Sequence, residues 1–365
     1  MASFNFDFGE DELDEDIQKL GLGGEAGNAQ DENSKREGQA AEKGPRVEAK
    51  ELKFDDLLYH LPPRISYSKV RVDLGTEGEA ATVYRRDLFD ARFQLLNDGE
   101  DEEEKQGEGK WSAGADSDLV PGVYEGGLKT WECSLDLVQV LKKRATPVNG
   151  KSVLELGCGT AVPCLYLFSD LLALEPPKDD SQKKETTFTL CDFNEQALKL
   201  VTLPNLFLAW YFSPSNPHQD ADSGDVELDD ETIDSFKSAL EARRISLRFF
   251  SGPWQGLADA GALTTPSAGK HDVVVTSETI YSLETLPILV DALQAAAGGA
   301  RKPGSESEES QKQETLCLVA AKVLYFGVGG GLSAFEEQVT KSGGNCETIW
   351  KTTRGVGRVI DLVRW

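Results

Sequence analysis

The chain has 365 residues, of which 39% are hydrophobic, and this is enough apolar material for one large folded domain or two small ones. Its formal net charge of −25 at pH 7 disfavours nucleic acid as a direct partner, because phosphate binding needs clustered Lys and Arg. The N-terminus carries no signal-peptide pattern and no apolar run reaches membrane-spanning length, so a soluble protein without membrane contact is expected.

The six cysteines and three histidines do not suggest a metal site. No two cysteines form a C-x-x-C pair, and the histidines do not cluster with them in the sequence. Several cysteines fall in apolar segments, where the thiol behaves as a small hydrophobic side chain. We therefore expect a reduced intracellular protein with no metal.

The N-terminal third is predicted to lie outside the main domain. Residues 1–50 are acidic and rich in Gly, Gln and Lys, a composition typical of a disordered tail. Phe4, Phe6 and Phe8 alternate with polar residues there; they suit a docking tip, although a plain solvated tail is the simpler interpretation. Residues 51–118 read as an intermittently apolar extension followed by a charged linker.

From residue 119 to 365 the pattern is that of an α/β domain. A helix is predicted at 131–141, followed by a buried strand at 152–156, a glycine turn, and a second helix that continues through Phe168. Five more strands are predicted, the last of them in a possible hairpin with 348–351: 187–191, 245–250, 272–277, 316–321 and 359–363. Strands that alternate with helices indicate a mainly parallel sheet with helices on both faces and an antiparallel closing strand.

Four polar insertions separate these elements, and we expect each to be a surface loop. They lie at residues 176–184, 213–230, 262–270 and 301–314. The stretch 194–210 between two of the strands is predicted as helix or loop.

The glycine turn at Gly157 and Gly159 indicates a ligand site. A dinucleotide fingerprint needs a third glycine and a phosphate loop needs a following Lys, and both are missing here. The remaining pattern, Glu155-x-Gly-x-Gly after a strand, resembles the first motif of S-adenosylmethionine-dependent methyltransferases. Glu155 is expected at the strand end where ligands of open α/β sheets gather. The alternative is an ordinary strand-turn-helix without a ligand.

Polar and aromatic residues follow the other predicted strands at their carboxyl ends. Asp192 is placed to accept hydrogen bonds from ribose hydroxyls, although a helix cap is an equal alternative for it alone. The turn Gly252-Pro253-Trp254 offers an indole to cover an adenine. Ser277 and Glu278 would lie beside the methyl group and the methionine part.

Five segments together resemble the histidine protein methyltransferase family, a branch of the seven-strand, class I, Rossmann-like protein methyltransferases. The resemblance covers residues 119–365 and also touches Phe4–Gly9 and Leu88–Leu96. The five segments are Val123–Leu137, which contains Gly-Gly-Leu-Lys-Thr-Trp-Glu-Cys-Ser, then Glu155–Ala161, Leu203–Asn205, Ser277–Tyr281 and Tyr325–Gly331.

This resemblance implies a substrate, a cofactor and site residues. The family transfers a methyl group from S-adenosyl-L-methionine to a ring nitrogen of a histidine in a large-subunit ribosomal protein of the L3 type, in cytoplasm and nucleus, linking it to ribosome biogenesis and translation. A basic ribosomal protein suits the acidic charge of this chain, and we expect a monomer. The implied cofactor contacts are Thr130, Trp131, Glu132, Cys133, Ser134, Gly157, Gly159, Asp192, Phe193, Asn194, Gly252, Pro253, Trp254 and Ser277.

Glu278 and Tyr281 are the candidate catalytic residues. A neutral ring nitrogen already has a lone pair, so the enzyme must orient the ring and hold it neutral rather than supply a strong base. Glu278 is expected to accept a hydrogen bond from the opposite ring nitrogen, while Tyr281 and Trp131 wall the pocket. Simple packing is the alternative for Tyr281, and His271 needs no role.

Two other functions remain open from the sequence. The first is a protein-lysine methyltransferase of the same fold that acts on another translation protein. Lysine-modifying relatives mostly carry Asp at the position of Glu278, and only the stretch from Gly126 to Cys133 argues against this alternative. The second is a catalytically silent module that binds a ribosomal protein. The intact Gly157, Gly159 and Asp192 count against loss of cofactor binding.

Overall fold

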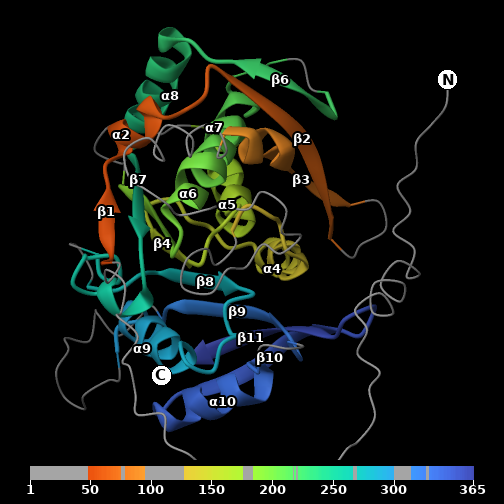
Figure 1. The fold of residues 1–365 in the computed structure, drawn as a ribbon, viewed down its shortest axis with the longest axis vertical. Helices are drawn as coiled ribbons and strands as arrows, with labels where there is room; N and C mark the ends of the chain where they lie inside the picture. The colour runs from red at the N-terminus through yellow and green to blue at the C-terminus, as the bar shows by residue number, and fades with distance from the viewer. Residues whose placement is uncertain are drawn as a thin grey trace, which may run out of the picture. The chain divides into compact units, whose positions relative to one another are not determined.

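The computed structural model describes residues 48–74, 79–94, 127–175, 184–216, 218, 221–265, 269–299, 314–325 and 329–365. Its central element is an eight-stranded sheet with the strand order β1-β7-β5-β4-β8-β9-β11-β10 (Figure 1). The strands are β1 (Lys50–Leu52), β4 (Ser152–Leu156), β5 (Thr186–Asp192), β7 (Ile245–Ser251), β8 (Val273–Ser277), β9 (Leu316–Lys322), β10 (Asn345–Thr352) and β11 (Arg358–Arg364).

The five central strands run parallel, and the strands at both edges are antiparallel. β7, β5, β4, β8 and β9 pair in parallel, with Leu156 of β4 opposite Cys191 on one side and Thr276 on the other. β11 joins β9 antiparallel and forms a hairpin with β10. The predicted closing strand and its hairpin are therefore confirmed, as is the mainly parallel α/β sheet.

Helices cover both faces because alternate residues of each buried strand point to opposite sides. Val153 packs in one hydrophobic cluster, together with α4 (Glu132–Lys143), α5 (Val162–Leu172) and α7 (Leu203–Tyr211). The next residue, Leu154, packs in a second cluster, together with α9 (Leu286–Ala296) and α10 (Leu332–Lys341). Figure 1 shows these two helix groups on opposite sides of the sheet.

The extension before the main domain is built into the same fold. β1 lengthens the sheet by pairing with β7, and α2 (Phe54–Tyr59) buries Leu57 and Leu58 in the larger core cluster. β2 (Arg64–Asp73) and β3 (Ala80–Arg86) form an antiparallel pair that packs on this cluster through Ile65 and Tyr67. The boundary proposed at residue 119 falls among residues that the structure does not describe.

Two of the predicted surface loops are wrong in part. Residues 213–230 contain β6 (Ser223–Glu227), which pairs with β2 as the third strand of a small sheet, and α8 (Asp230–Ala242) begins at the end of this stretch. In the stretch 262–270, Ala262 and Leu263 are buried in the second cluster, to which α9 also contributes. Apart from Lys184 and Glu314 at their ends, the insertions 176–184 and 301–314 lie outside the described residues, as do the tail 1–47 and the linker 98–118.

The stretch 194–210, predicted as helix or loop, is helical from Glu195 onward, with Asn194 as its N-cap. It contains α6 (Glu195–Ala197), a π-helix, η2 (Leu198–Thr202), and then α7. Pro204 stands in the first turn of α7, the position of a helix at which proline is tolerated, directly after the wider π-helical turn. This irregular junction places Thr202 and Asn205 next to the glycine turn.

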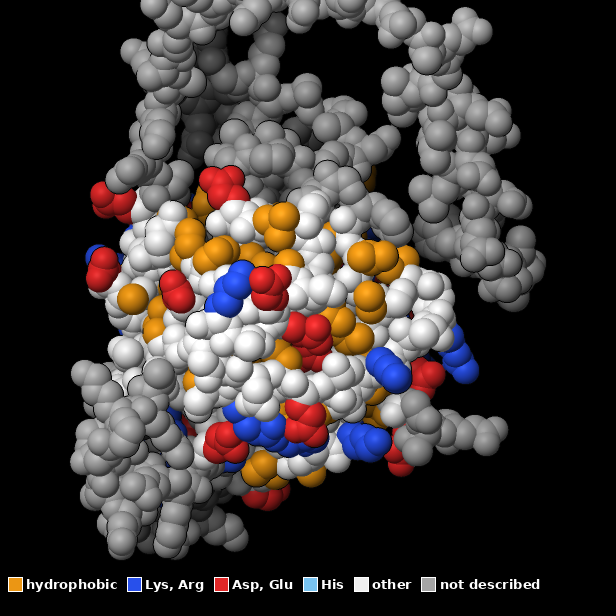
Figure 2. All heavy atoms as spheres, turned by 90° about the horizontal axis from the view of Figure 1, so that it is seen from below, with side chains coloured by type: hydrophobic (Ala, Val, Ile, Leu, Met, Phe, Trp, Pro, Cys, Tyr) orange, Lys and Arg blue, Asp and Glu red, His pale blue; other side chains and the backbone are white. Residues whose placement is uncertain are grey.

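Figure 2 shows one face of the molecule, seen from below Figure 1. Acidic and basic side chains alternate there with hydrophobic ones, and no patch of a single sign dominates the coloured surface. The structure contains no described helix that is long and apolar enough to cross a membrane.

Candidate functional site

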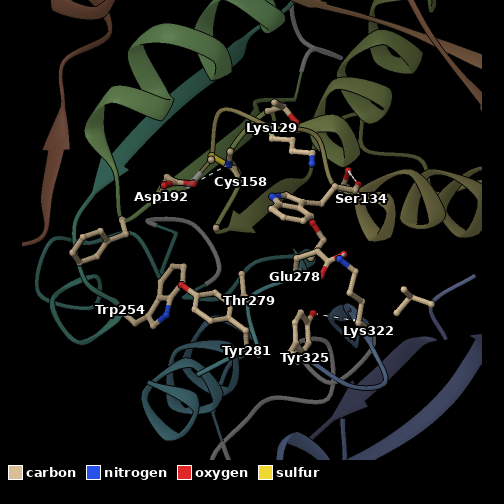
Figure 3. Close-up of a pocket in the computed structure, with 18 of the residues that line it drawn as sticks. Lys129, Ser134, Cys158, Asp192, Trp254, Glu278, Thr279, Tyr281, Lys322 and Tyr325 are labelled. Carbon is tan, nitrogen blue, oxygen red and sulfur yellow. Dashed lines mark hydrogen bonds and ion pairs between the residues drawn. The ribbon is translucent and has the colours of Figure 1, made fainter. Parts of the chain in front are cut away.

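A cavity of about 370 Å³ opens at the carboxyl ends of β4, β5, β8 and β9 (Figure 3). This volume lies within the range of small-molecule sites. Asp192 and Trp254 lie toward one end of the cavity, and Glu278 and Lys322 toward the other. The lining residues are Gly127, Lys129, Trp131, Ser134, Gly157, Cys158, Gly159, Thr160, Asp192, Phe193, Trp254, Ser277, Glu278, Thr279, Tyr281, Lys322, Leu324, Tyr325 and Val356.

The glycine turn is constrained by both backbone angle and space. Gly157 and Gly159 have φ values of 64° and 46°, in the left-handed region that favours glycine. A Cβ at Gly157 would lie 2.5 Å from Cγ2 of Thr279, and one at Gly159 would lie 2.9 Å from the carbonyl oxygen of Gly127. Both glycines line the cavity.

The irregular helix junction holds this turn from behind. The Thr202 hydroxyl donates to the carbonyl oxygen of Gly159 at 2.6 Å, and the Asn205 side-chain amide donates to that of Thr160 at 3.0 Å. The Asn205 oxygen in turn accepts from the backbone N–H of Arg86 in β3. The Leu203-Pro-Asn205 motif therefore fixes the loop and ties the extension to the site.

Asp192 lies at the end of β5 with its carboxylate already oriented. One oxygen accepts from the N–H of Gly159 at 2.8 Å and the other from the N–H of Asn194 at 2.9 Å. Each oxygen retains a lone pair for a further donor. Burial raises the pKa of Asp192 to about 6. Asn194 does not line the cavity; its side chain caps α6 by accepting from Gln196.

The position expected for Glu155 is wrong. It lies inside β4 rather than at a ligand-facing end, is 1% exposed, and does not line the cavity. Its carboxyl group accepts from the N–H of Cys164 at 3.1 Å, in the first turn of α5, where a helix has unpaired N–H groups. Burial raises the pKa of Glu155 to about 8.

The raised pKa of Glu155 predicts a pH-dependent stability difference from the Glu155→Gln variant. The folded protein keeps this proton up to pH 8, whereas the unfolded chain releases it near pH 4.5, so wild-type stability falls as pH rises between these values. As pH rises through this window, the unfolding free energy of the variant should increase relative to that of the wild type by about 1.4 kcal/mol per pH unit. Urea unfolding of both proteins at pH 5 to 8.5 measures this difference in unfolding free energy. A difference that does not change with pH would contradict the prediction.

Of the turn after β7, only Trp254 lines the cavity. Gly252 has a φ of 115°, and a Cβ there would lie 2.7 Å from the Cα of Ala49, so this glycine is required by the segment that leads into β1. Pro253 is the residue before the short 3-10 helix η3 (Trp254–Gly256), which carries the indole. The N-terminal extension thus packs directly behind the turn.

The segment 130–134 contributes two lining side chains, Trp131 and Ser134. Thr130 instead forms a hydrogen bond to the Thr160 hydroxyl at 3.1 Å. Glu132 points to Lys322 at 3.6 Å, and Cys133 is fully buried. Burial and the nearby Glu278 carboxylate raise the pKa of the Cys133 thiol well above its usual range, so this thiol stays protonated.

Glu278 and Tyr281, the candidate catalytic residues, both line the cavity. Glu278 has a φ of 59°, an uncommon conformation for a non-glycine residue. Its Oε1 atom is buried and has no hydrogen-bond partner among the described residues. Tyr281 is held through its carbonyl oxygen, which accepts from the N–H of Gly330 at 2.9 Å.

Five polar lining residues were not predicted from the sequence: Lys129, Thr160, Thr279, Lys322 and Tyr325. Lys322 ends β9, so the strand-end rule that found Asp192 and Glu278 would also have found it. Tyr325 lies in a segment of the family resemblance but was given no role. Burial, followed by the charge of Glu278, raises the pKa of its phenol well above the usual range.

The cavity has the features that a nucleoside with a charged tail requires. It offers an oriented carboxylate, an indole, and a glycine turn whose backbone has no Cβ, so that a ligand can lie close to it. No group of three or more His, Cys, Asp or Glu in the described residues is arranged to hold a metal ion. All six cysteines are free thiols.

Comparison with known proteins gives consistent relatives, although no protein-family model matches the chain. The chain is 33% identical over 338 residues to histidine protein methyltransferase 1 of Schizosaccharomyces pombe, spanning 90% of each protein. It is 30% identical over 271 residues to the Saccharomyces cerevisiae protein of that name, covering 70% of this chain and 67% of that one.

Likeness to solved structures is weaker. The magnesium protoporphyrin IX methyltransferase of Synechocystis, solved with bound SAH, matches with a TM-score of 0.34 and 11% identity, over 63% of this chain and 80% of that chain.

Proposed function

The chain belongs to the histidine protein methyltransferase 1 family, and on this premise we propose that its target histidine lies in an L3-type large-subunit ribosomal protein. The enzyme is an S-adenosylmethionine-dependent protein-histidine methyltransferase. The family resemblance of residues 119–365 supports the substrate, and the net charge of −25 favours encounter with a basic protein. The proposal includes action by a monomer, without nucleic acid, in cytoplasm and nucleus.

The observation that carries the reaction is Oε1 of Glu278, which is buried beside the cavity and accepts no hydrogen bond from the described residues, although the Lys322 ammonium lies 3.5 Å away. S-adenosylmethionine supplies a methyl group on positively charged sulfur, which a neutral imidazole nitrogen can attack with its lone pair. Glu278 accepts a hydrogen bond from the N–H of the opposite ring nitrogen and thereby selects the tautomer that presents the reactive one. Trp131 and Tyr281 wall the ring.

The proton balance requires only one acceptor. Methylation of a neutral ring leaves it with a positive charge and an N–H on the other nitrogen. That proton passes to the Glu278 carboxylate or to water, which restores a neutral methylated ring. Because the nucleophile needs no deprotonation beforehand, positioning and charge control account for most of the contribution of the protein.

Asp192 is proposed to accept from the ribose hydroxyls of the cofactor, and its pKa of about 6 makes binding pH-dependent. The ionised carboxylate is the stronger acceptor, and protonation removes it below pH 6. The Kd for S-adenosylhomocysteine should therefore rise about tenfold between pH 7 and pH 5. Calorimetry on the wild type and on Asp192→Asn measures this; the variant should bind more weakly with little pH dependence. Equal pH dependence in both would contradict the role.

The substrate proposal is tested by transfer of labelled methyl groups to a recombinant L3-type protein, compared with the same protein in assembled large subunits. Labelling of the free protein supports the proposal, and stronger labelling is expected there if the target becomes buried on assembly. No labelling of either, with the cofactor still bound, would contradict the proposed substrate.

A further inference from the structure

Lys322 lines the cavity at the end that also holds Glu278. Its ammonium lies 3.5 Å from Oε1 of Glu278 and 3.6 Å from a carboxylate oxygen of Glu132. The same ammonium lies 4.6 Å from the centroid of the Trp131 ring. The side chain is only 18% exposed, and Figure 3 shows it beside Glu278 and Tyr325. The Lys322 ammonium is therefore fixed in position by its neighbours, unlike that of a free surface lysine.

The other titratable groups around this ammonium and the Trp131 ring come from three segments. Helix α4 contributes Glu132 and Cys133. The loop before α4 contributes Lys129, whose ammonium lies 4.9 Å from the centroid of the same Trp131 ring. The Tyr325 phenol oxygen accepts from the backbone N–H of Lys322 at 3.2 Å.

Farther along α4, Asp136 is already paired with Arg358 at 2.6 Å. With the thiol and phenol protonated, the formal charges of Glu132, Glu278, Lys129 and Lys322 cancel.

This balance matters because of the chemistry at Glu278. A carboxylate alone beside an imidazole favours the protonated ring, which raises the pKa of the ring. The protonated ring has no lone pair and does not react. A hydrogen-bonding carboxylate thus orients the target but also favours its unreactive form, unless a nearby positive charge offsets it.

We propose that Lys322 is a positioning residue that offsets the Glu278 charge and so keeps the target imidazole neutral at physiological pH. The inference rests on the proposed role of Glu278 in histidine methylation. A second consequence follows for selectivity: without Lys322 the cavity gains one net negative charge, which attracts protonated side chains and weakens discrimination against lysine.

The test is the pH profile of kcat, at saturating S-adenosylmethionine, for the wild type, Lys322→Met, Lys322→Gln and Lys322→Arg. In the Met and Gln variants the acidic limb should move upward by about one pH unit, so that activity lost at pH 7 is largely recovered at pH 9. Lys322→Arg should keep the wild-type limb. Lys341→Met, which removes an exposed charge at the end of α10, is the matched control and should leave the profile unchanged.

A purely structural role for Lys322 would lower kcat equally at every pH, and this result would overturn the proposal. The proposal would also be overturned if Lys322→Met and Lys322→Gln both kept the acidic limb of the wild type while calorimetry showed unchanged cofactor affinity. A wild type that methylates no histidine would instead remove the proposed function. A wild type that methylates histidine with an unmoved limb in the variants removes only the role of Lys322.

Discussion

Replacing Glu278 by Gln is expected to lower kcat about 10-fold while the affinity for S-adenosylmethionine stays within about twofold. The substitution keeps the size of the side chain but exchanges a charge-assisted hydrogen bond for a neutral one of about half the strength, a loss of roughly 1–1.5 kcal/mol when the bond forms in the transition state. Asp192 and Trp254, which line the opposite end of the cavity, are not touched by the change. Steady-state kinetics and calorimetry separate the two effects.

Glu132 supplies a matched control for this experiment. Its carboxylate lies 3.6 Å from the Lys322 ammonium, close to the 3.5 Å of Glu278, but it does not line the cavity. Glu132→Gln should therefore change kcat by no more than about threefold. A Glu278→Gln enzyme as active as the wild type, or two variants with the same loss, would rule out the hydrogen bond from Glu278 to the target ring.

Replacing Gly157 by Ala is expected to weaken binding of S-adenosylhomocysteine about 100-fold. The φ of 64° costs a side chain roughly 1–2 kcal/mol, and the new Cβ would lie 2.5 Å from Cγ2 of Thr279, so the turn must shift. The turn forms the floor of the cavity beside Asp192, whose carboxylate is bound to Gly159. Calorimetry of the purified variant measures the loss.

A second substitution separates the clash from the backbone strain. Thr279→Ser removes Cγ2 but keeps the hydroxyl, which forms a 2.7 Å hydrogen bond with Thr276. The double variant should recover about a tenth of wild-type affinity. Gly261→Ala introduces a side chain at a φ of 82° with nothing within 4 Å, away from this cavity, and should leave binding unchanged. Full affinity in Gly157→Ala would contradict the close packing at this turn.

The main sheet could be predicted from the sequence because its strands are buried on both faces. The strand predicted at 152–156 matches β4 at both ends. Each of the other five predicted strands begins and ends within one residue of the strand in the structure. Continuous apolar runs such as Val273–Val275 leave little doubt about strand assignment. The small sheet could not be predicted, since Val226 is the only buried residue of β6 and its partner strand lies more than 150 residues away.

The site was predicted in part for an equally physical reason. The strand-end rule places Asp192, Ser277 and Glu278 at one edge of the sheet, and all three line the cavity. The rule cannot reveal which charges face one another, because Glu132, Glu278 and Lys322 come from three elements that meet only in the fold. Glu155 was misplaced because its register in β4 turns the carboxyl group toward the first turn of α5.

The central claim is that this cavity delivers a methyl group to a histidine, and tandem mass spectrometry of the methylated product tests it most directly. The enzyme is incubated with an L3-type protein and S-adenosylmethionine, and the modified peptide is fragmented to locate the added mass. One methyl group on a histidine ring, greatly reduced with Glu278→Gln, is the predicted result. A methyl group on a lysine of that peptide, with histidine unmodified, would contradict the account.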